Sequence, residues 1–196
     1  MIRVLSGDPG TRNFALAVQE AKVVEGRLKI RIIGTAMIPD THTLTDLKEE
    51  TQDQLKRFRR IMIGLRKEYE PDFVLMERFQ SRGMGGATIE HVNMMLGVAM
   101  LSFRGASCDI LTAAMWKNRT HKFFDLKAAY RGYGLTSKAK AYTGIAEHEL
   151  DAALIGLYQL HKAFDLPPFQ MFEDNCLDDY IAALQRKADN RLTLEL

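Results

Sequence analysis

A short apolar run near the middle of the chain constrains the fold more than any other feature. The run "FVLM" covers Phe73 to Met76, follows Pro71 and ends at Glu77. An uninterrupted apolar run of this length is typical of a strand that is covered on both faces, as in a parallel or mixed sheet. The chain is therefore expected to fold as an α/β protein.

The first 38 residues predict a three-stranded antiparallel meander. Strand-like segments cover Met1–Leu5, Phe14–Val18 and Arg27–Ile38, and turn residues in Gly7–Asn13 join the first two. Their β-branched residues favour strands, and their short connection favours a hairpin. The meander and the later apolar run would together supply most of one sheet.

Three later segments have the spacing of amphipathic helices. In Thr45–Tyr69 the apolar residues recur every three or four positions, at Leu55, Phe58, Met62, Leu65 and Tyr69. Thr88–Phe103 and Glu147–Phe164 have a similar spacing, and "CDIL", Cys108–Leu111, is a candidate strand. Residues 113–143 are helical or irregular by the same criteria, and no element is assigned there.

The length and composition indicate one main domain. The chain has 196 residues, of which 46% are hydrophobic and 27% charged, as in ordinary globular proteins. We assign residues 1–164 to this domain and 165–196 to a C-terminal extension, in which 174–190 has the apolar stripe of an amphipathic helix. Neither a signal peptide nor a membrane span is recognised, and Cys108 and Cys176 form no metal or disulfide motif. We expect a protein of a reducing cytoplasm, with no membrane partner.

Charge is unevenly distributed along the chain, although the formal net charge is only +2. Residues 104–140 contain eight Lys and Arg but two acids, whereas residues 141–196 contain four Lys and Arg and ten acids. The basic part also contains the aromatic residues Trp116, Phe123, Phe124, Tyr130 and Tyr133. Cations for phosphates and rings for bases are typical of a nucleic-acid surface. A solvated charged face with aromatic residues in the core explains the pattern equally well.

Four polar residues occur where apolar elements end or begin. Asp8 follows the first strand, Glu77 follows the central apolar run, and His148 and Asp151 lie three residues apart on the late helix. Residues at that spacing share a helix face. If the strands that end at Asp8 and Glu77 are neighbours, the two carboxylates end side by side and the helix can cover them. Each residue also has a simpler explanation, because Asp before Pro-Gly is common in turns and the others suit a solvated edge.

Clustered carboxylates repel one another and favour a bound cation. Oxygen ligands of this kind suit Mg²⁺ or Mn²⁺. Two such ions about 3.5–4 Å apart can activate a water and stabilise the leaving oxygen in phosphodiester hydrolysis. Under this hypothesis Asp8 is a metal ligand, and Pro9-Gly10 turns the chain away to leave room for a phosphate.

Four segments, in order, resemble the RuvC-like Holliday junction resolvases of the RNase H-like (retroviral integrase) superfamily. They are "SGDPGTRNFALAV", "PDFVLMERFQSRG", "TIEHVNMMLGVAMLSF" and "HELDAALIGLYQL", and the resemblance extends from Ile2 to about His161. It implies a five-stranded mixed sheet in the order 3-2-1-4-5, flanked by helices. The tail after Phe164 matches no known segment, which suits a phage-type member. The resemblance thus implies the cytoplasm of a bacterial or phage-infected cell.

The resemblance also implies an activity, a site and a partner. The activity would be a Mg²⁺-dependent endonuclease, with two ions per site, that acts as a homodimer on four-way DNA junctions. Asp8, Glu77, His148 and Asp151 would take the catalytic and metal-binding positions, with Glu147 as a lesser candidate. The DNA contacts that we assign are Arg12, Phe79, Arg82, Lys117, Arg119, Lys122, Lys138 and Lys140, with Phe79 as the wedge at the junction centre.

Other functions remain open from the sequence. A nuclease of the same fold could act on flaps, forks or RNA–DNA hybrids. The "DPGT" motif also resembles the first phosphate loop of actin-like ATPases, although that fold needs a second acidic, Gly-rich loop and a longer chain. A non-catalytic DNA-binding module is the third alternative, and the four competent residue types at the site disfavour it.

Overall fold

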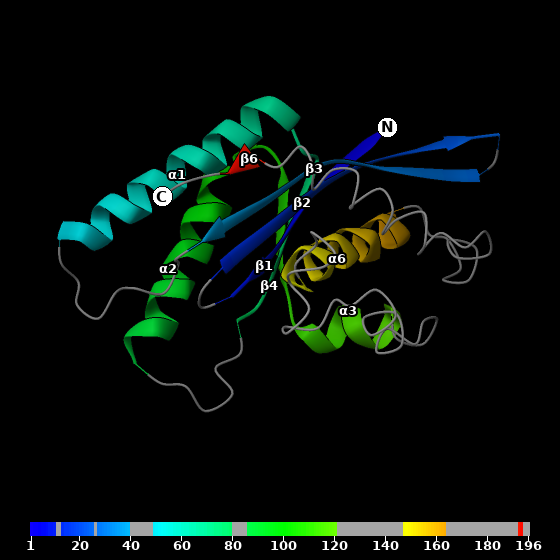
Figure 1. Cartoon of the computed structure of the whole chain (residues 1–196). Coiled ribbons are helices and arrows are strands. Elements are labelled where there is room, and N and C mark those ends of the chain that lie inside the picture. The colour runs from blue at the N-terminus through cyan, green and yellow to red at the C-terminus, as the bar shows by residue number, and fades with distance from the viewer. Residues whose placement is uncertain are drawn as a thin grey trace.

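In the computed structural model, the described residues are 1–10, 13–25, 27–39, 49–79, 86–120, 147–163 and 192–193. They form a sheet between two layers of helices (Figure 1). The strands are β1 Ile2–Pro9, β2 Asn13–Val24, β3 Arg27–Pro39, β4 Phe73–Glu77, β5 Ser107–Leu111 and β6 Leu192–Thr193. The helices are α1 Glu49–Tyr69, α2 Ala87–Ser102, α3 Ala113–Thr120 and α6 Glu147–Ala163.

The sheet has the strand order β5-β4-β1-β2-β3-β6. β1, β2 and β3 are antiparallel neighbours, and β4 and β5 run parallel to β1. The predicted meander and the predicted order 3-2-1-4-5 are confirmed. The short strand β6, which pairs with Ala36 and Met37 of β3, was not predicted.

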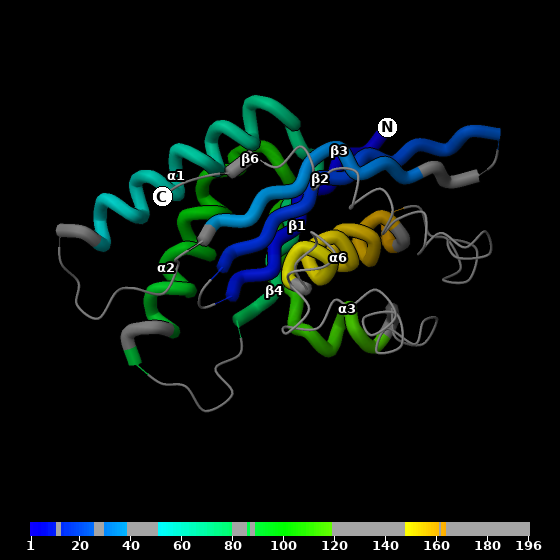
Figure 2. Tube along the Cα trace, viewed as in Figure 1, coloured from blue at the N-terminus to red at the C-terminus, as the bar shows by residue number. Residues whose placement is uncertain are grey.

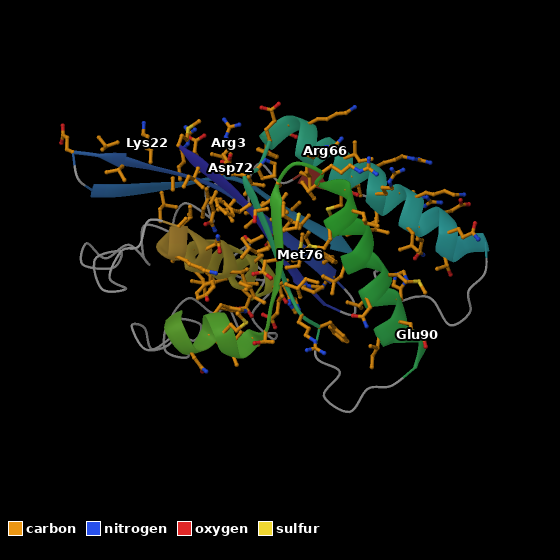
Figure 3. All side chains as sticks on the ribbon, turned by 180° about the vertical axis from the view of Figure 1, so that it is seen from behind. Arg3, Lys22, Arg66, Asp72, Met76 and Glu90 are labelled. Atoms are coloured by element: carbon orange, nitrogen blue, oxygen red, sulfur yellow. The ribbon has the colours of Figure 1, made fainter. Side chains whose placement is uncertain are left out.

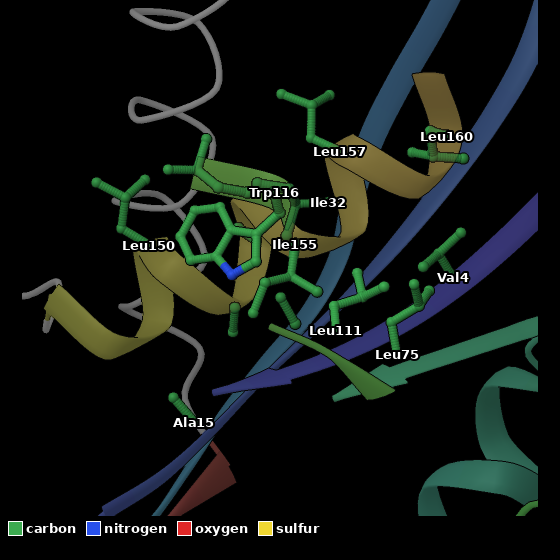
Figure 4. Packing of buried hydrophobic residues seen from close by; sticks show 14 of the residues in the cluster. Val4, Ala15, Ile32, Leu75, Leu111, Trp116, Leu150, Ile155, Leu157 and Leu160 are labelled. Carbon is green, nitrogen blue, oxygen red and sulfur yellow. The ribbon is translucent and has the colours of Figure 1, made fainter. Parts of the chain in front are cut away.

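Successive side chains of each strand point to opposite faces of the sheet, and each face has its own core. Leu5, Val74 and Met76 pack with α1 and α2, whereas Val4 and Leu75 pack with α3 and α6. Figure 4 shows the core that contains Val4 and Leu75, in which the apolar side chains of α6 lie over β1 and β4. The apolar run that predicted a strand covered on both faces is β4, and that prediction is confirmed.

The helix predictions hold where the structure describes the chain. The apolar face of α1 is confirmed, since Phe58, Met62 and Leu65 are buried. The predicted start of this helix at Thr45 and the predicted helix 174–190 lie outside the described residues, and the domain boundary after residue 164 stays a prediction. None of the described helices is long and apolar enough to cross a membrane.

The late helix α6 crosses the first strands although it is far from them in sequence. Figure 2 shows α6 beside β1 and β2, and its contacts with β1, β2 and β4 hold it on one face of the sheet. This is the face toward which the side chains of Val4 and Leu75 point. Any polar side chain on the same face of β1 or β4 therefore meets α6.

Candidate active site

Asp8 and Glu77 end two neighbouring parallel strands. The strand register pairs Gly7 of β1 with Met76 of β4, so the next residue on each strand is one of these two acids. Both point to the α6 face, because Asp8 follows Ser6 and Glu77 follows Leu75 by two positions. Asp8 is 8% exposed, and Glu77 is partly buried. The prediction that these carboxylates lie side by side at one edge of the sheet is supported by this register.

α6 brings His148 and Asp151 to the same edge. The imidazole Nδ1 of His148 lies 2.6 Å from Oδ2 of Asp8. Asp151 is buried one turn further along the helix. The turn after β1 also approaches this point: the N–H of Gly10 donates to the carbonyl of Asn13, and a Cβ on Gly10 would lie 3.5 Å from Cε1 of His148.

Two neighbouring residues of α3 complete the cluster, and the sequence did not predict their roles there. The indole N–H of Trp116 donates to Oε2 of Glu77 over 2.7 Å. The Lys117 ammonium lies 3.1 Å from Oδ2 of Asp151 and 4.8 Å from the centre of the Trp116 ring. From the sequence, Trp116 is one of the aromatic residues of the basic segment, and Lys117 is a predicted phosphate contact.

The Trp116 side chain is fully buried, so of the two interpretations that the sequence left open, an aromatic residue in the core is the one that holds for it. It packs between α3 and α6 in the core shown in Figure 4. Its N–H meets a carboxylate instead, as buried indoles usually do with polar partners. Sequence spacing gives no signal for this contact, because it joins residues 39 positions apart.

The electrostatics of Glu77 and Lys117 indicate that the acids act as one group. Burial and the nearby Asp8 raise the pKa of Glu77 to about 7, against the opposing effects of Lys117 and the Trp116 hydrogen bond. Burial lowers the pKa of Lys117, but the carboxylates of Asp151, Glu77 and Asp8 outweigh it and hold that pKa above its usual value. The cluster therefore has more negative charge than one lysine balances, which favours a further cation.

The donor types of the cluster fit a divalent metal ion. Its three carboxylates are oxygen ligands of the kind that Mg²⁺ and Mn²⁺ accept in proteins. Within the part of the chain that the structure describes, however, no three His, Cys, Asp or Glu side chains are gathered around one point. Instead they form pairs: Asp8 with His148, and Asp151 with Lys117. These pairs would have to separate for all four side chains to share an ion.

The other predicted site residues are placed only in part. Phe79 is partly buried and packs against the core between the sheet and the α1/α2 layer; its role as a wedge stays a prediction. Glu147 and Arg119 lie in α6 and α3, but their side chains are outside what the structure describes. Also outside it are the predicted DNA contacts Arg12, Arg82, Lys122, Lys138 and Lys140.

A polar contact beneath the site fixes α6 on the sheet. The Gln19 amide of β2 donates to the carbonyl of Ala153 in α6. A Cβ on Gly156 would lie 2.7 Å from Oγ of Ser6 and 2.8 Å from both amide atoms of Gln19. With Ser6 and Gln19 in these positions, position 156 has no room for a Cβ, and the same helix carries His148 and Asp151.

Comparisons with known proteins identify the fold. No protein-family model matches the chain, and no curated protein matches its sequence. Among solved structures, it is similar to RuvC of Thermus thermophilus in complex with a Holliday junction substrate. The two are 19% identical with a TM-score of 0.60, over 83% of this chain and 95% of that one. A further structure of Thermus thermophilus RuvC gives 18% identity and a TM-score of 0.54, over the same shares.

The yeast mitochondrial Holliday junction resolvase Ydc2 is similar as well. It is 15% identical with a TM-score of 0.52, and the match covers 96% of this chain and 84% of that one. The strand order and these similarities define the class of fold. It is an RNase H-like α/β fold, and it carries an acidic cluster at one edge of the sheet. Within that class the chain has the fold of the RuvC-like Holliday junction resolvases, as the resemblance predicted. The phage-type assignment stays a prediction.

Proposed function

We propose that the protein is a divalent-metal-dependent endonuclease that resolves four-way DNA junctions by paired phosphodiester hydrolysis. The observation that carries this proposal is the coupled cluster of Asp8, Glu77 and Asp151, joined by His148, at one edge of the sheet. The solved structures of similar fold include resolvases, one of them in complex with a Holliday junction substrate. A homodimer would place two such sites on a junction, since symmetric cuts suit a two-fold assembly.

In this proposal Asp8, Glu77, His148 and Asp151 hold the metal, with two Mg²⁺ per site and Mn²⁺ as a substitute. When bound, the metal supplies a water of lowered pKa and positive charge at the leaving oxygen. The donor set fits this role because it contains hard oxygen ligands, and because Glu77 is only partly ionised near neutral pH until a cation favours its charged form.

The neighbouring residues orient the acids. Trp116 holds one oxygen of Glu77 through its N–H, which fixes the direction of the carboxylate. Lys117 neutralises Asp151 while the cluster holds no metal. In this proposal Lys117 turns from Asp151 to a DNA phosphate once Asp151 holds the metal. The earlier assignment of Lys117 as a phosphate contact is retained in this form.

The test is cleavage of a labelled four-way junction, beside linear duplex, flap and RNA–DNA hybrid controls, with Mg²⁺ and with EDTA. Paired symmetric nicks that need Mg²⁺ and are confined to the junction are expected. Preferential cleavage of flaps or hybrids would replace the substrate, and no cleavage in Mg²⁺ or Mn²⁺ would leave a DNA-binding module.

The Asp8→Asn variant tests the metal role separately. The amide keeps the shape of the side chain but loses the charge that a cation requires. Cleavage should be abolished while junction binding in EDTA is largely retained. If binding and cleavage are lost together, Asp8 is a structural residue and the proposed metal site is wrong.

A further inference from the structure

The outer side of α1 is a basic surface on the opposite face of the sheet from the acidic cluster. Its exposed cations, which we call the α1 basic surface, are Lys56, Arg57, Arg59, Arg60 and Lys67. The exposed acids among residues 51–69 are Asp53 and Glu68. Figure 3 shows side chains of α1 projecting away from the sheet along the length of the helix. The buried stripe of this helix packs on the sheet, so the cations face solvent.

The cations lie close enough together to act as one surface. Lys56, Arg60 and Lys67 are four and seven residues apart, which places them along one line of the helix. This line is about 16 Å long at 1.5 Å per residue. The hydrogen bond and charge of Lys56, with the charges of Arg57 and Arg60, hold the pKa of Asp53 below its usual value. One carboxylate thus lies in the field of three cations.

The surroundings favour a polyanion over a membrane or an apolar partner. A helix that enters a membrane needs an exposed apolar face, and most protein interfaces contain exposed aromatic or apolar anchors. In the described part of the chain, the large exposed hydrophobic residues lie on other segments: Met1, Val23, Leu101, Ile110 and Met115. Three of the five cations are arginines, whose planar guanidinium matches phosphate oxygens in a bidentate way.

We propose that the α1 basic surface binds the phosphate backbone of a duplex DNA segment that is distinct from the segment at the acidic cluster. α6 and the acidic cluster occupy the other face of the sheet, so a phosphate at that cluster is out of reach of α1 (Figure 1). The contacts would be to backbone and independent of sequence. This inference rests on the proposed function only in that the protein binds DNA. It does not require that the protein cleaves DNA.

The test measures DNA binding in EDTA, where no cleavage occurs. The variant carries Arg57→Gln, Arg60→Gln and Lys67→Gln. Its matched control carries three exposed cations changed to Gln on other elements, at Lys22, Arg31 and Lys162. Fluorescence anisotropy with a labelled linear duplex and a labelled junction gives the affinity over a salt series. Circular dichroism checks that both proteins are folded.

The two variants are expected to differ in salt dependence. Each lost phosphate contact lowers the slope of log K against log salt by about 0.9, so the α1 variant should be less steep by about 2 to 3. The control should stay near the wild-type slope. Equal slopes for all three proteins, or equal losses in both variants, would overturn the proposal, as would a charge-dependent binding to anionic vesicles with no change toward DNA.

Failure of this inference can be told apart from failure of the proposed function. If the wild-type protein cuts junctions in Mg²⁺ but the α1 variant has an unchanged slope, only the surface is wrong. If the wild-type protein cuts no branched DNA but the α1 variant has the reduced slope, the surface stands and the nuclease is wrong.

Discussion

Replacing Gly156 by Ala should damage both the stability and the activity of the protein, because it adds a methyl group where α6 touches β1 and β2. The new Cβ would lie 2.7 Å from Oγ of Ser6 and 2.8 Å from the amide atoms of Gln19. Carbon atoms normally keep about 3.5 Å or more from such neighbours. Either the buried Ser6 and Gln19 side chains must give up their present positions, and with them the hydrogen bond from Gln19 to Ala153, or the helix that carries His148 and Asp151 must move outward.

The magnitude follows from two opposing effects. Overpacking of a filled interior costs about 1–3 kcal/mol, whereas Ala in place of Gly within a helix gains about 1 kcal/mol. The net loss in the free energy of unfolding is thus about 0–2 kcal/mol. Gly64→Ala in α1 is the matched control, because no heavy atom lies within 4 Å of its added Cβ. Gly64→Ala should gain only the higher helix propensity of Ala. The free energies of unfolding of the two variants should therefore differ by about 1–3 kcal/mol.

Urea unfolding in EDTA gives the stabilities, and single-turnover cleavage of a junction in Mg²⁺ gives the rates. The Gly156→Ala rate should fall while the Gly64→Ala rate stays at the wild-type value. A Ser6→Ala, Gln19→Ala background lacks the atoms that clash with the new Cβ. Gly156→Ala should therefore cost less stability in that background than in the wild type, and the difference between the two costs is the coupling energy. The reasoning is refuted if Gly156→Ala is as stable as its control, or costs the same in both backgrounds.

Three further predictions concern the acidic cluster. Folded Glu77 keeps its proton up to about pH 7, whereas the unfolded residue releases it near 4.5. The folded state therefore binds more protons in this window, and the metal-free protein should lose stability as the pH rises through it. Glu77→Gln should remove that loss and so be more stable than the wild type at pH 8, by about 1–2 kcal/mol because the carboxyl is only partly buried and solvent screens part of the effect; urea unfolding in EDTA at several pH values measures it, and parallel curves for both proteins would contradict it. Trp116→Phe removes a hydrogen bond that favours ionised Glu77. The acidic limb of the pH–rate profile should move to higher pH, and an unmoved limb would argue that the indole only fills space. Lys117→Gln takes from Asp151 its charged partner at 3.1 Å, and should lower metal-free stability by about 1–3 kcal/mol. Added Mg²⁺ should restore more stability to this variant than to wild type, as thermal unfolding with and without the ion would show; an equal response would remove Asp151 from the metal ligands.

Much of the fold could be predicted because its signals are local. The apolar run of β4, the turn after β1 and the apolar stripe of α1 are each visible within a few residues. Asp8 and Glu77 were predictable for the same reason, since each stands where an apolar strand ends. Their adjacency required only that β1 and β4 be neighbours.

The rest of the site depends on contacts that no local pattern encodes. Trp116 and Lys117 lie in a segment without clear periodicity, and their partners, Glu77 of β4 and Asp151 of α6, are brought to them only by the packing of α3 in the fold. The Gln19 amide and the Ala153 carbonyl are 134 residues apart. Such pairs appear only when the helix is already placed on the sheet. The basic residues of α1 and its apolar stripe were both visible in the sequence, but the solvent exposure of the face opposite the stripe follows only from the packing of α1 on the sheet.

The short strand β6 has a consequence for how this protein is handled. Leu192 and Thr193 pair with Ala36 and Met37 of β3, which otherwise ends the sheet on that side. An uncovered strand edge is a template for pairing with other chains. A truncation before residue 192 would therefore expose Ala36 and Met37 of β3 to pairing with other chains, so a purification tag is better joined through a linker after this strand than substituted for it.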